Sequence, residues 1–190
     1  MRTEALISEL SSGDDERAEA AAKALASLGA EALPALGELL AADDEDTRWW
    51  AVRALAGIQA EGAGALLVRS LGDPSTAVRQ AALLGIRAQP QPGTIPLLIA
   101  LLDDADSLCA AMAADALVGI GSEAVPALLE VMQGGAHSAR LEAERALAEI
   151  GDPRAIPALY AALDEGSALM EYWATQGLEK MGVGMTFFKP

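Results

Sequence analysis

The 190-residue chain carries 28 acidic and 13 basic residues, which gives a net charge of −15 at pH 7. A charge of this sign and size excludes a surface built to bind nucleic acid phosphates or anionic membranes. Hydrophobic residues make up 52% of the chain but aromatic residues only 4%, so the core must consist mainly of alanine and leucine, which favours packed helices over sheets.

The N-terminal residues 1–10 ("MRTEALISEL") hold no apolar run long enough for a signal peptide. No later stretch approaches the roughly 20 apolar residues of a membrane span. Cys109 is the only cysteine, so no internal disulfide can form. These features predict a cytoplasmic protein.

A helix with a buried alanine recurs along the chain in steps of 30 or 31 residues. The alanines are Ala21, Ala51, Ala82, Ala113, Ala143 and Ala174. Four residues later stand the aliphatic residues Leu25, Leu55, Ile86, Leu117, Leu147 and Leu178. Spacing of this kind places both positions on one face of a helix.

A second apolar helix precedes each of these, with leucines on the same steps at Leu6, Leu36, Leu67, Leu98, Leu128 and Leu159. Pro34, Pro96, Pro126 and Pro157 fall in the first turn of their helices, where a missing N–H is tolerated. Neither helix can bury its apolar face alone, so the pairs must stack. The pattern predicts an all-α fold, a right-handed α-α superhelix of about twelve helices in six repeats: 1–30, 31–60, 61–90, 91–121, 122–151 and 152–182.

Two segments depart from the repeat. Pro90 and Pro92 replace the usual ending of the third repeat, which predicts that its second helix stops near Ala88, at a stiff break inside a single domain of residues 1–190. The tail 183–190 matches no repeat and contains Phe187 and Phe188. We expect it to cap the last layer; the alternative is an apolar peptide offered to a partner.

Acidic clusters occupy the turns before the second helices, for example "GDDE" at 13–16 and "DDED" at 43–46. Carboxylates there cap a helix and complement its dipole, and the spacing of a calcium-binding loop is absent. We expect these clusters to form an acidic rim along one edge of the repeats. His137 is the only histidine, so with a single cysteine the chain offers no nucleophile–base pair and no zinc site. The sequence therefore predicts no metal, no cofactor and no enzymatic activity.

The segments "GDPRAIPALYAALDE", "DPSTAVRQAALLGI" and "RLEAERALAEIG" closely resemble HEAT repeats of the short type first associated with phycobilisome bilin lyases. The resemblance runs from about Glu4 to Gly182. It implies a HEAT-like solenoid, but such repeats occur in scaffolds, lyase subunits, hydroxylases and DNA-repair proteins. It also implies that Arg48, Arg79 and Arg140 form a ladder with the aspartates of the turns.

The neighbouring Trp49 and Trp50 point about 100° apart on a helix, so one core direction cannot hold both. Trp50 is explained by packing against a neighbouring helix, whereas Trp49 faces outward. In HEAT solenoids the second helix lines the concave surface, so outward positions of these helices predict a partner-binding groove. Its predicted residues are Trp49, Arg53, Gln80, Leu83, Leu84, Arg87, Asp115, Val118, Leu141, Arg145, Tyr172 and Gln176.

Exposed aromatic, aliphatic and arginine side chains are typical of protein-binding surfaces. The favoured function is thus a non-enzymatic scaffold that binds a protein or peptide in the groove, where Arg53, Arg87 and Arg145 select acidic or phosphorylated groups. The alternative is a bilin-lyase-like protein in which Arg53 and Arg87 hold the propionates of a tetrapyrrole. A third hypothesis, a HEAT-like DNA glycosylase, is disfavoured by the acidic charge, and no nucleic acid or membrane partner is expected.

Overall fold

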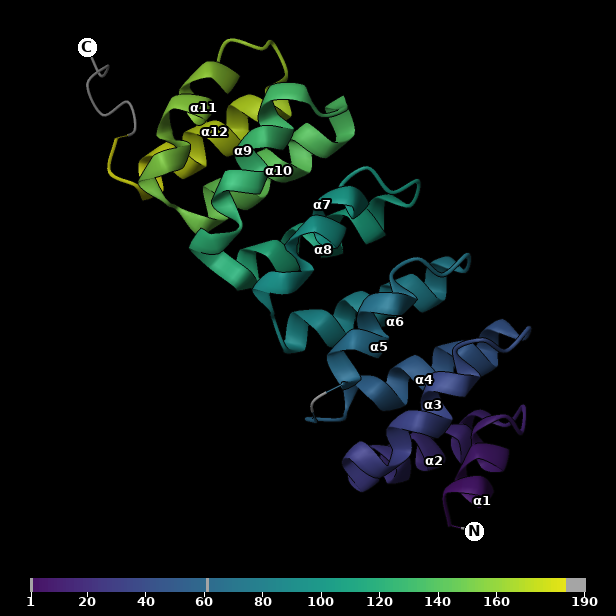
Figure 1. Cartoon of the computed structure of the whole chain (residues 1–190). Coiled ribbons are helices and arrows are strands. Elements are labelled where there is room, and N and C mark those ends of the chain that lie inside the picture. Colours follow the sequence, from purple (N-terminus) through teal and green to yellow (C-terminus); the bar gives the residue numbers. More distant parts are fainter. Residues whose placement is uncertain (1, 61, 184–190) are drawn as a thin grey trace. The chain divides into compact units, whose positions relative to one another are not determined.

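A computed structural model describes residues 2–60 and 62–183. These residues form twelve α-helices, joined by turns and short 3₁₀ segments, and no β-strand occurs among them (Figure 1). The chain divides into two compact units, Met1–Gln89 and Pro90–Pro190. None of the described helices is long and apolar enough to span a bilayer.

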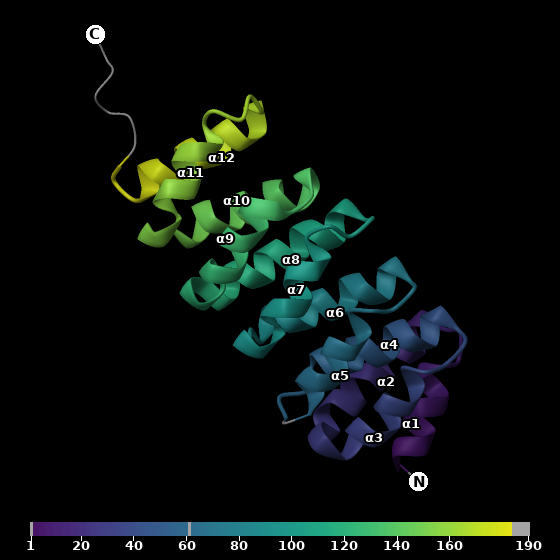
Figure 2. The ribbon, with the colours of Figure 1, turned by 45° about the horizontal axis from the view of Figure 1, so that its top comes forward.

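Unit 1 contains three helical hairpins. The first helices of the hairpins are α1 (Arg2–Leu10), α3 (Leu33–Leu39) and α5 (Ala63–Ser70). The second helices are α2 (Asp15–Leu28), α4 (Glu45–Ala56) and α6 (Thr76–Ala88). The second helices pack in a row, with α4 between α2 and α6 (Figure 2).

Unit 2 repeats this arrangement. Its first helices are α7 (Ile95–Leu101), α9 (Val125–Gly134) and α11 (Ile156–Ala162). Its second helices are α8 (Ser107–Ile120), α10 (His137–Ile150) and α12 (Ala168–Lys180). Again they form a row, in which α10 contacts both α8 and α12.

The predicted alanine register is confirmed. The six recurring alanines are at most 2% exposed, and the six aliphatic residues that follow them by four positions are at most 3% exposed. A buried alanine at this position lets neighbouring second helices approach closely, which is why the same residue type recurs in every repeat. The predicted fold class, all-α and built from stacked HEAT-like hairpins, is correct.

The helix ends follow the predicted capping chemistry. Asp14, Asp44 and Asp106 accept hydrogen bonds from the backbone N–H three residues later, at 2.7–3.0 Å. The two hydrogen bonds from Thr47, through its hydroxyl and its N–H, hold the pKa of Asp44 below its ordinary value. Proline stands in the first turn of α3, α7, α9 and α11, as expected.

The third repeat ends as its prolines predict, since α6 stops at Ala88. The division into units falls at the next peptide, between Gln89 and Pro90. The expectation that residues 1–190 form a single domain stays a prediction. The predicted cap of Phe187 and Phe188 lies outside the described residues.

Replacing Gly177 of α12 by alanine should destabilise unit 2. An added Cβ would lie 2.8 Å from the Cα of Ala148 and 2.8 Å from Cδ1 of Leu159, so backbone would have to move. We expect a loss of about 1–3 kcal/mol in the free energy of unfolding, measured by urea denaturation. Gly134→Ala is the control, since a Cβ there meets nothing within 4 Å; equal midpoints for the two variants would contradict the packing.

Candidate functional site: a partner-binding surface

The predicted groove residues fall into two sets, one in each unit. Trp49 and Arg53 lie on α4, and α6 carries Gln80, Leu83, Leu84 and Arg87. In unit 2 the predicted residues are Asp115 and Val118 on α8, Leu141 and Arg145 on α10, and Tyr172 and Gln176 on α12. All except Leu83 are half-buried or exposed, and the most exposed apolar side chains among them are Leu84 (50%) and Tyr172 (52%).

Leu83 was wrongly predicted to be exposed. Its side chain is completely buried, as is that of Val52, which occupies the same position of the preceding repeat. The reason is that each second helix packs against its own first helix and also against neighbouring second helices, so the buried face is wider than a single stripe. Leu83 is therefore a core residue, and Leu84 alone presents an apolar side chain to solvent at this point of α6.

The expected role of Arg145 in selecting acidic groups of a partner also needs correction. Its guanidinium donates to Asp115 at 2.9 Å, to Glu142 at 3.0 Å and to Glu149 at 2.9 Å, and it reaches the carbonyl of Ala111 at 2.8 Å. Three carboxylates already surround the cation, and its side chain is only 15% exposed. Arg145 thus ties α10 to α8 within unit 2.

Trp49 and Trp50 form an edge-to-face pair on α4, with ring centroids 4.8 Å apart. Both side chains are half-buried, so neither indole belongs to the closed core. The guanidinium carbon of Arg53 lies 5.4 Å from the centroid of the Trp49 ring, within the range of a cation–π contact. Trp49 therefore already attracts a cation through its ring.

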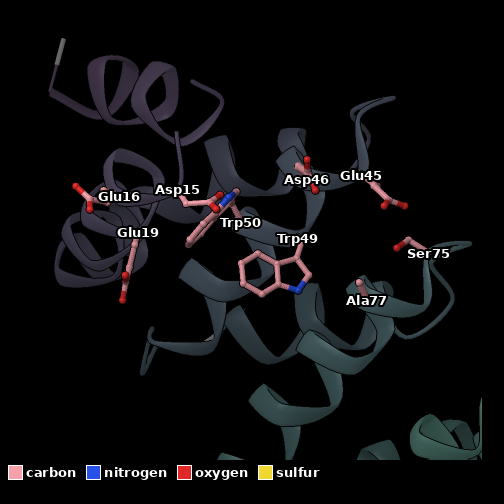
Figure 3. A pocket seen from close by; sticks show the side chains of 9 residues that line it. All are labelled: Asp15, Glu16, Glu19, Glu45, Asp46, Trp49, Trp50, Ser75 and Ala77. Atoms are coloured by element: carbon pink, nitrogen blue, oxygen red, sulfur yellow. The ribbon is translucent and has the colours of Figure 1, made fainter. Parts of the chain in front are cut away.

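The two indoles line an open cavity of about 550 Å³ in unit 1, which we name the tryptophan cleft (Figure 3). Its other walls come from the N-terminal turns of the three second helices. The lining residues are Asp15, Glu16, Glu19, Glu45, Asp46, Trp49, Trp50, Ser75 and Ala77. The cleft thus combines an aromatic pair with five carboxylate side chains.

The sequence predicted helix capping and an acidic rim along one edge, but not the place of these residues beside Trp49. The rim follows from the repeat register. Asp15 and Glu45 occupy the same repeat position 30 residues apart, as do Glu16 and Asp46. Because equivalent positions of stacked repeats lie side by side, the register itself brings these carboxylates to one edge.

The predicted ladder of arginines and turn aspartates is confirmed at Arg48, whereas Arg140 pairs with a glutamate. In unit 1, Arg48 donates from Nε and Nη2 to both oxygens of Asp73, at 2.8 and 2.9 Å. In unit 2, Arg140 bonds to Glu165, likewise 25 residues further on. Arg79 donates to the backbone carbonyl of Asp73 at 3.0 Å. Each of these bonds ties the start of a second helix to a turn between helices.

Unit 2 also buries an unpartnered carboxyl group. Glu144 of α10 is 0% exposed, and neither of its oxygens has a hydrogen-bond partner. Desolvation, helped by the nearby charge of Glu165 and opposed by Arg140, raises the pKa of Glu144 to about 8. Among the described repeats the equivalent position is apolar and buried at Ala22, Val52, Leu83 and Ala114.

Helical hairpins that stack within each unit define a helical repeat protein. The sequence matches the family of HEAT repeats over residues 3–87, 65–147 and 95–179. The protein belongs to this family.

Two curated relatives share its repeats. Over 78 residues, 41% of this chain and 28% of the relative, it is 41% identical to phycocyanobilin lyase subunit beta of Pseudanabaena tenuis. Over 101 residues, 53% of this chain and 49% of the relative, it is 36% identical to a phycobilisome maturation protein of Synechococcus elongatus. The chain therefore spans less than half the length of either relative.

A solved structure, the complex of CpcE and CpcF of phycocyanin lyase from Nostoc sp., has a similar fold, with a TM-score of 0.59. It is 21% identical, and the match covers 76% of this chain and 96% of that one. The expectation that the protein is not an enzyme is contradicted by these findings, because a relative with 41% identity is named as a lyase subunit. The predicted scaffold function is supported only by the repeat fold, which the match to the HEAT family shows.

Proposed function

We propose that the protein is a subunit of a bilin-lyase-type assembly, which binds a protein partner and takes part in handling a tetrapyrrole. The observation that carries this proposal is the 41% identity to phycocyanobilin lyase subunit beta. The relative named for phycobilisome maturation also supports it. A cytoplasmic location is part of the proposal.

The face formed by α4 and α6 suits this role. A tetrapyrrole has a large apolar body and two propionates, and this face offers the Trp49 ring, the half-exposed Leu84 and the exposed residues Arg53 and Arg87. Arginine is suited to carboxylates because its planar fork can donate two parallel hydrogen bonds. The two helices pack directly against each other within unit 1.

Titration of the full chain with phycocyanobilin tests the proposal. We expect a saturable change in visible absorbance, and we expect Arg53→Gln to weaken it about tenfold through loss of a charge-assisted hydrogen bond. The control is Arg154→Gln, which removes an exposed arginine of unit 2 that bonds to Asp152. If absorbance stays unchanged both with and without phycocyanin apoprotein as the acceptor, the proposal is wrong.

A further inference from the structure

The tryptophan cleft shares Trp49 with the face proposed for a tetrapyrrole, but its rim differs chemically from that face. Its rim carries carboxylates from the N-terminal ends of α2 and α4, whereas Arg53 stands about two turns further along α4. Figure 3 shows Asp15, Glu16 and Glu19 on one side of the two indoles and Glu45 and Asp46 on the other. An anionic ligand would meet repulsion from both sides of this cleft.

Most carboxylates of the cleft form no ion pair within the described part of the chain. Glu19 pairs with Lys23 at 2.8 Å, but no ion pair is formed there by Asp15, Glu16, Glu45 or Asp46. Arg17 and Arg48, the cations nearest in sequence to these carboxylates, pair with Glu9 and Asp73 instead. The carboxylates therefore create a negative potential that is concentrated against a low-polarity indole surface.

The aromatic pair is a second feature that helix capping does not explain. At the position of Trp49 the other second helices carry Glu19, Gln80, Ala111, Leu141 and Tyr172. The fold thus does not need an indole there, and both rings remain partly exposed in an edge-to-face pair. Partly exposed tryptophans beside a cavity are typical of protein-binding hot spots.

Carboxylates and indoles together select organic cations. The Trp49 ring already attracts the guanidinium of Arg53. A lysine or arginine of a partner would gain the same cation–π contact and would also be attracted electrostatically by the carboxylates of the rim. A metal ion does not fit, because no set of three or more donors in the described residues converges closely enough to hold one. The cavity, about 550 Å³, is large enough for more than one side chain.

We propose that the tryptophan cleft binds a lysine- or arginine-rich segment of a partner protein. The basic side chains lie between the carboxylates of the α2 and α4 first turns, and one of them stacks on Trp49. The proposal replaces the sequence-based expectation of an acidic or phosphorylated partner at this surface. It deepens only the partner-binding part of the proposed function and does not require a bilin.

The test is the binding of a labelled lysine–arginine hexapeptide to the full chain, followed by fluorescence anisotropy. We expect saturable binding that weakens on raising the salt from about 0.05 to about 0.5 M. The double variant Glu45→Gln with Asp46→Asn should raise Kd about tenfold, because it removes two rim charges and leaves the capping Asp44 in place. Trp49→Leu should raise Kd about threefold to tenfold through loss of the ring.

The matched control is Glu130→Gln with Glu179→Gln, which removes the same charge from exposed positions of unit 2 and should leave Kd within about twofold. Circular dichroism checks that every variant is folded. The proposal is overturned if the wild-type chain fails to bind the peptide, if a glutamate-rich hexapeptide binds equally well, or if the rim variant binds like the control. The peptide-binding assay contains no bilin, so its result does not depend on the outcome of the tetrapyrrole titration.

Discussion

Replacing Glu144 by leucine should make the protein more stable at pH 8 by about 4 kcal/mol, while changing its stability far less at pH 5. The pKa of this buried carboxyl is raised from 4.5 in the unfolded chain to about 8 in the folded protein. Between these values the folded protein holds a proton that the unfolded chain has released. The contribution of Glu144 to stability is thus fully present below pH 4.5 and falls as the pH rises toward 8, by about 1.4 kcal/mol per pH unit.

Leucine removes both the ionisable group and the two unpartnered oxygens, and it matches the Leu83 side chain that fills the same position in unit 1. Urea denaturation at pH 5, 6.5 and 8 measures the effect. Glu144→Gln should also abolish the pH dependence, since it keeps the size and cannot ionise. Glu130→Leu removes an exposed carboxylate of α9 and serves as the control. If the free energy of unfolding of Glu144→Leu depends on pH as strongly as that of the wild type, the assignment of this pH dependence to the buried Glu144 is wrong.

The fold could be predicted because one signal is repeated six times. Ala51 alone would not distinguish a buried helix from an exposed one, but six alanines at equal spacing fix the register, and all six are buried. Pro96 and Asp106 add local signals whose physics depends on neighbouring backbone atoms only. Predictions of this kind need no knowledge of which helices pack together.

The surface could be predicted only in part, because exposure depends on neighbours from other repeats. Leu83 and Leu84 are adjacent and chemically identical, yet one is completely buried and the other is 50% exposed. Glu144 breaks the general rule that charged residues are exposed, and no local pattern announces it. For Arg145 a signal was available, since Glu142 and Glu149 stand three residues before it and four after it, where helical ion pairs form.

Replacing the ladder arginine Arg48 should lower the free energy of unfolding more than replacing most other single residues of unit 1. Its side chain is 11% exposed and that of Asp73 is 9% exposed, and Arg48 also donates from Nη1 to the carbonyls of Ala42 and Asp43, both at 3.0 Å. Burial raises the pKa of Asp73, but hydrogen bonds from Arg48 and from the N–H of Ser75 outweigh this and hold the pKa below its ordinary value. The folded protein therefore depends on the charged form of this pair.

Arg48→Ala should lower the free energy of unfolding by about 3 kcal/mol at pH 7, because it leaves the Asp73 carboxylate and two carbonyls without their donor. The matched control is Arg17→Ala. Arg17 binds Glu9 through the same two-bond geometry, at 2.6 and 2.8 Å, but its side chain is 56% exposed, so water replaces the lost partner and stability should not change measurably. Urea midpoints at pH 7 compare the two.

The pH dependence of the Arg48→Ala deficit separates the charge from the packing of the arginine stem. Because the pKa of Asp73 is lowered in the folded protein, the stability that the pair contributes is present above the unfolded pKa of about 4 and is lost as the pH falls below it. The deficit should therefore shrink in acid, whereas a deficit caused by lost packing would persist. Equal destabilisation by Arg48→Ala and Arg17→Ala at pH 7 would show that burial of the ladder pair does not matter.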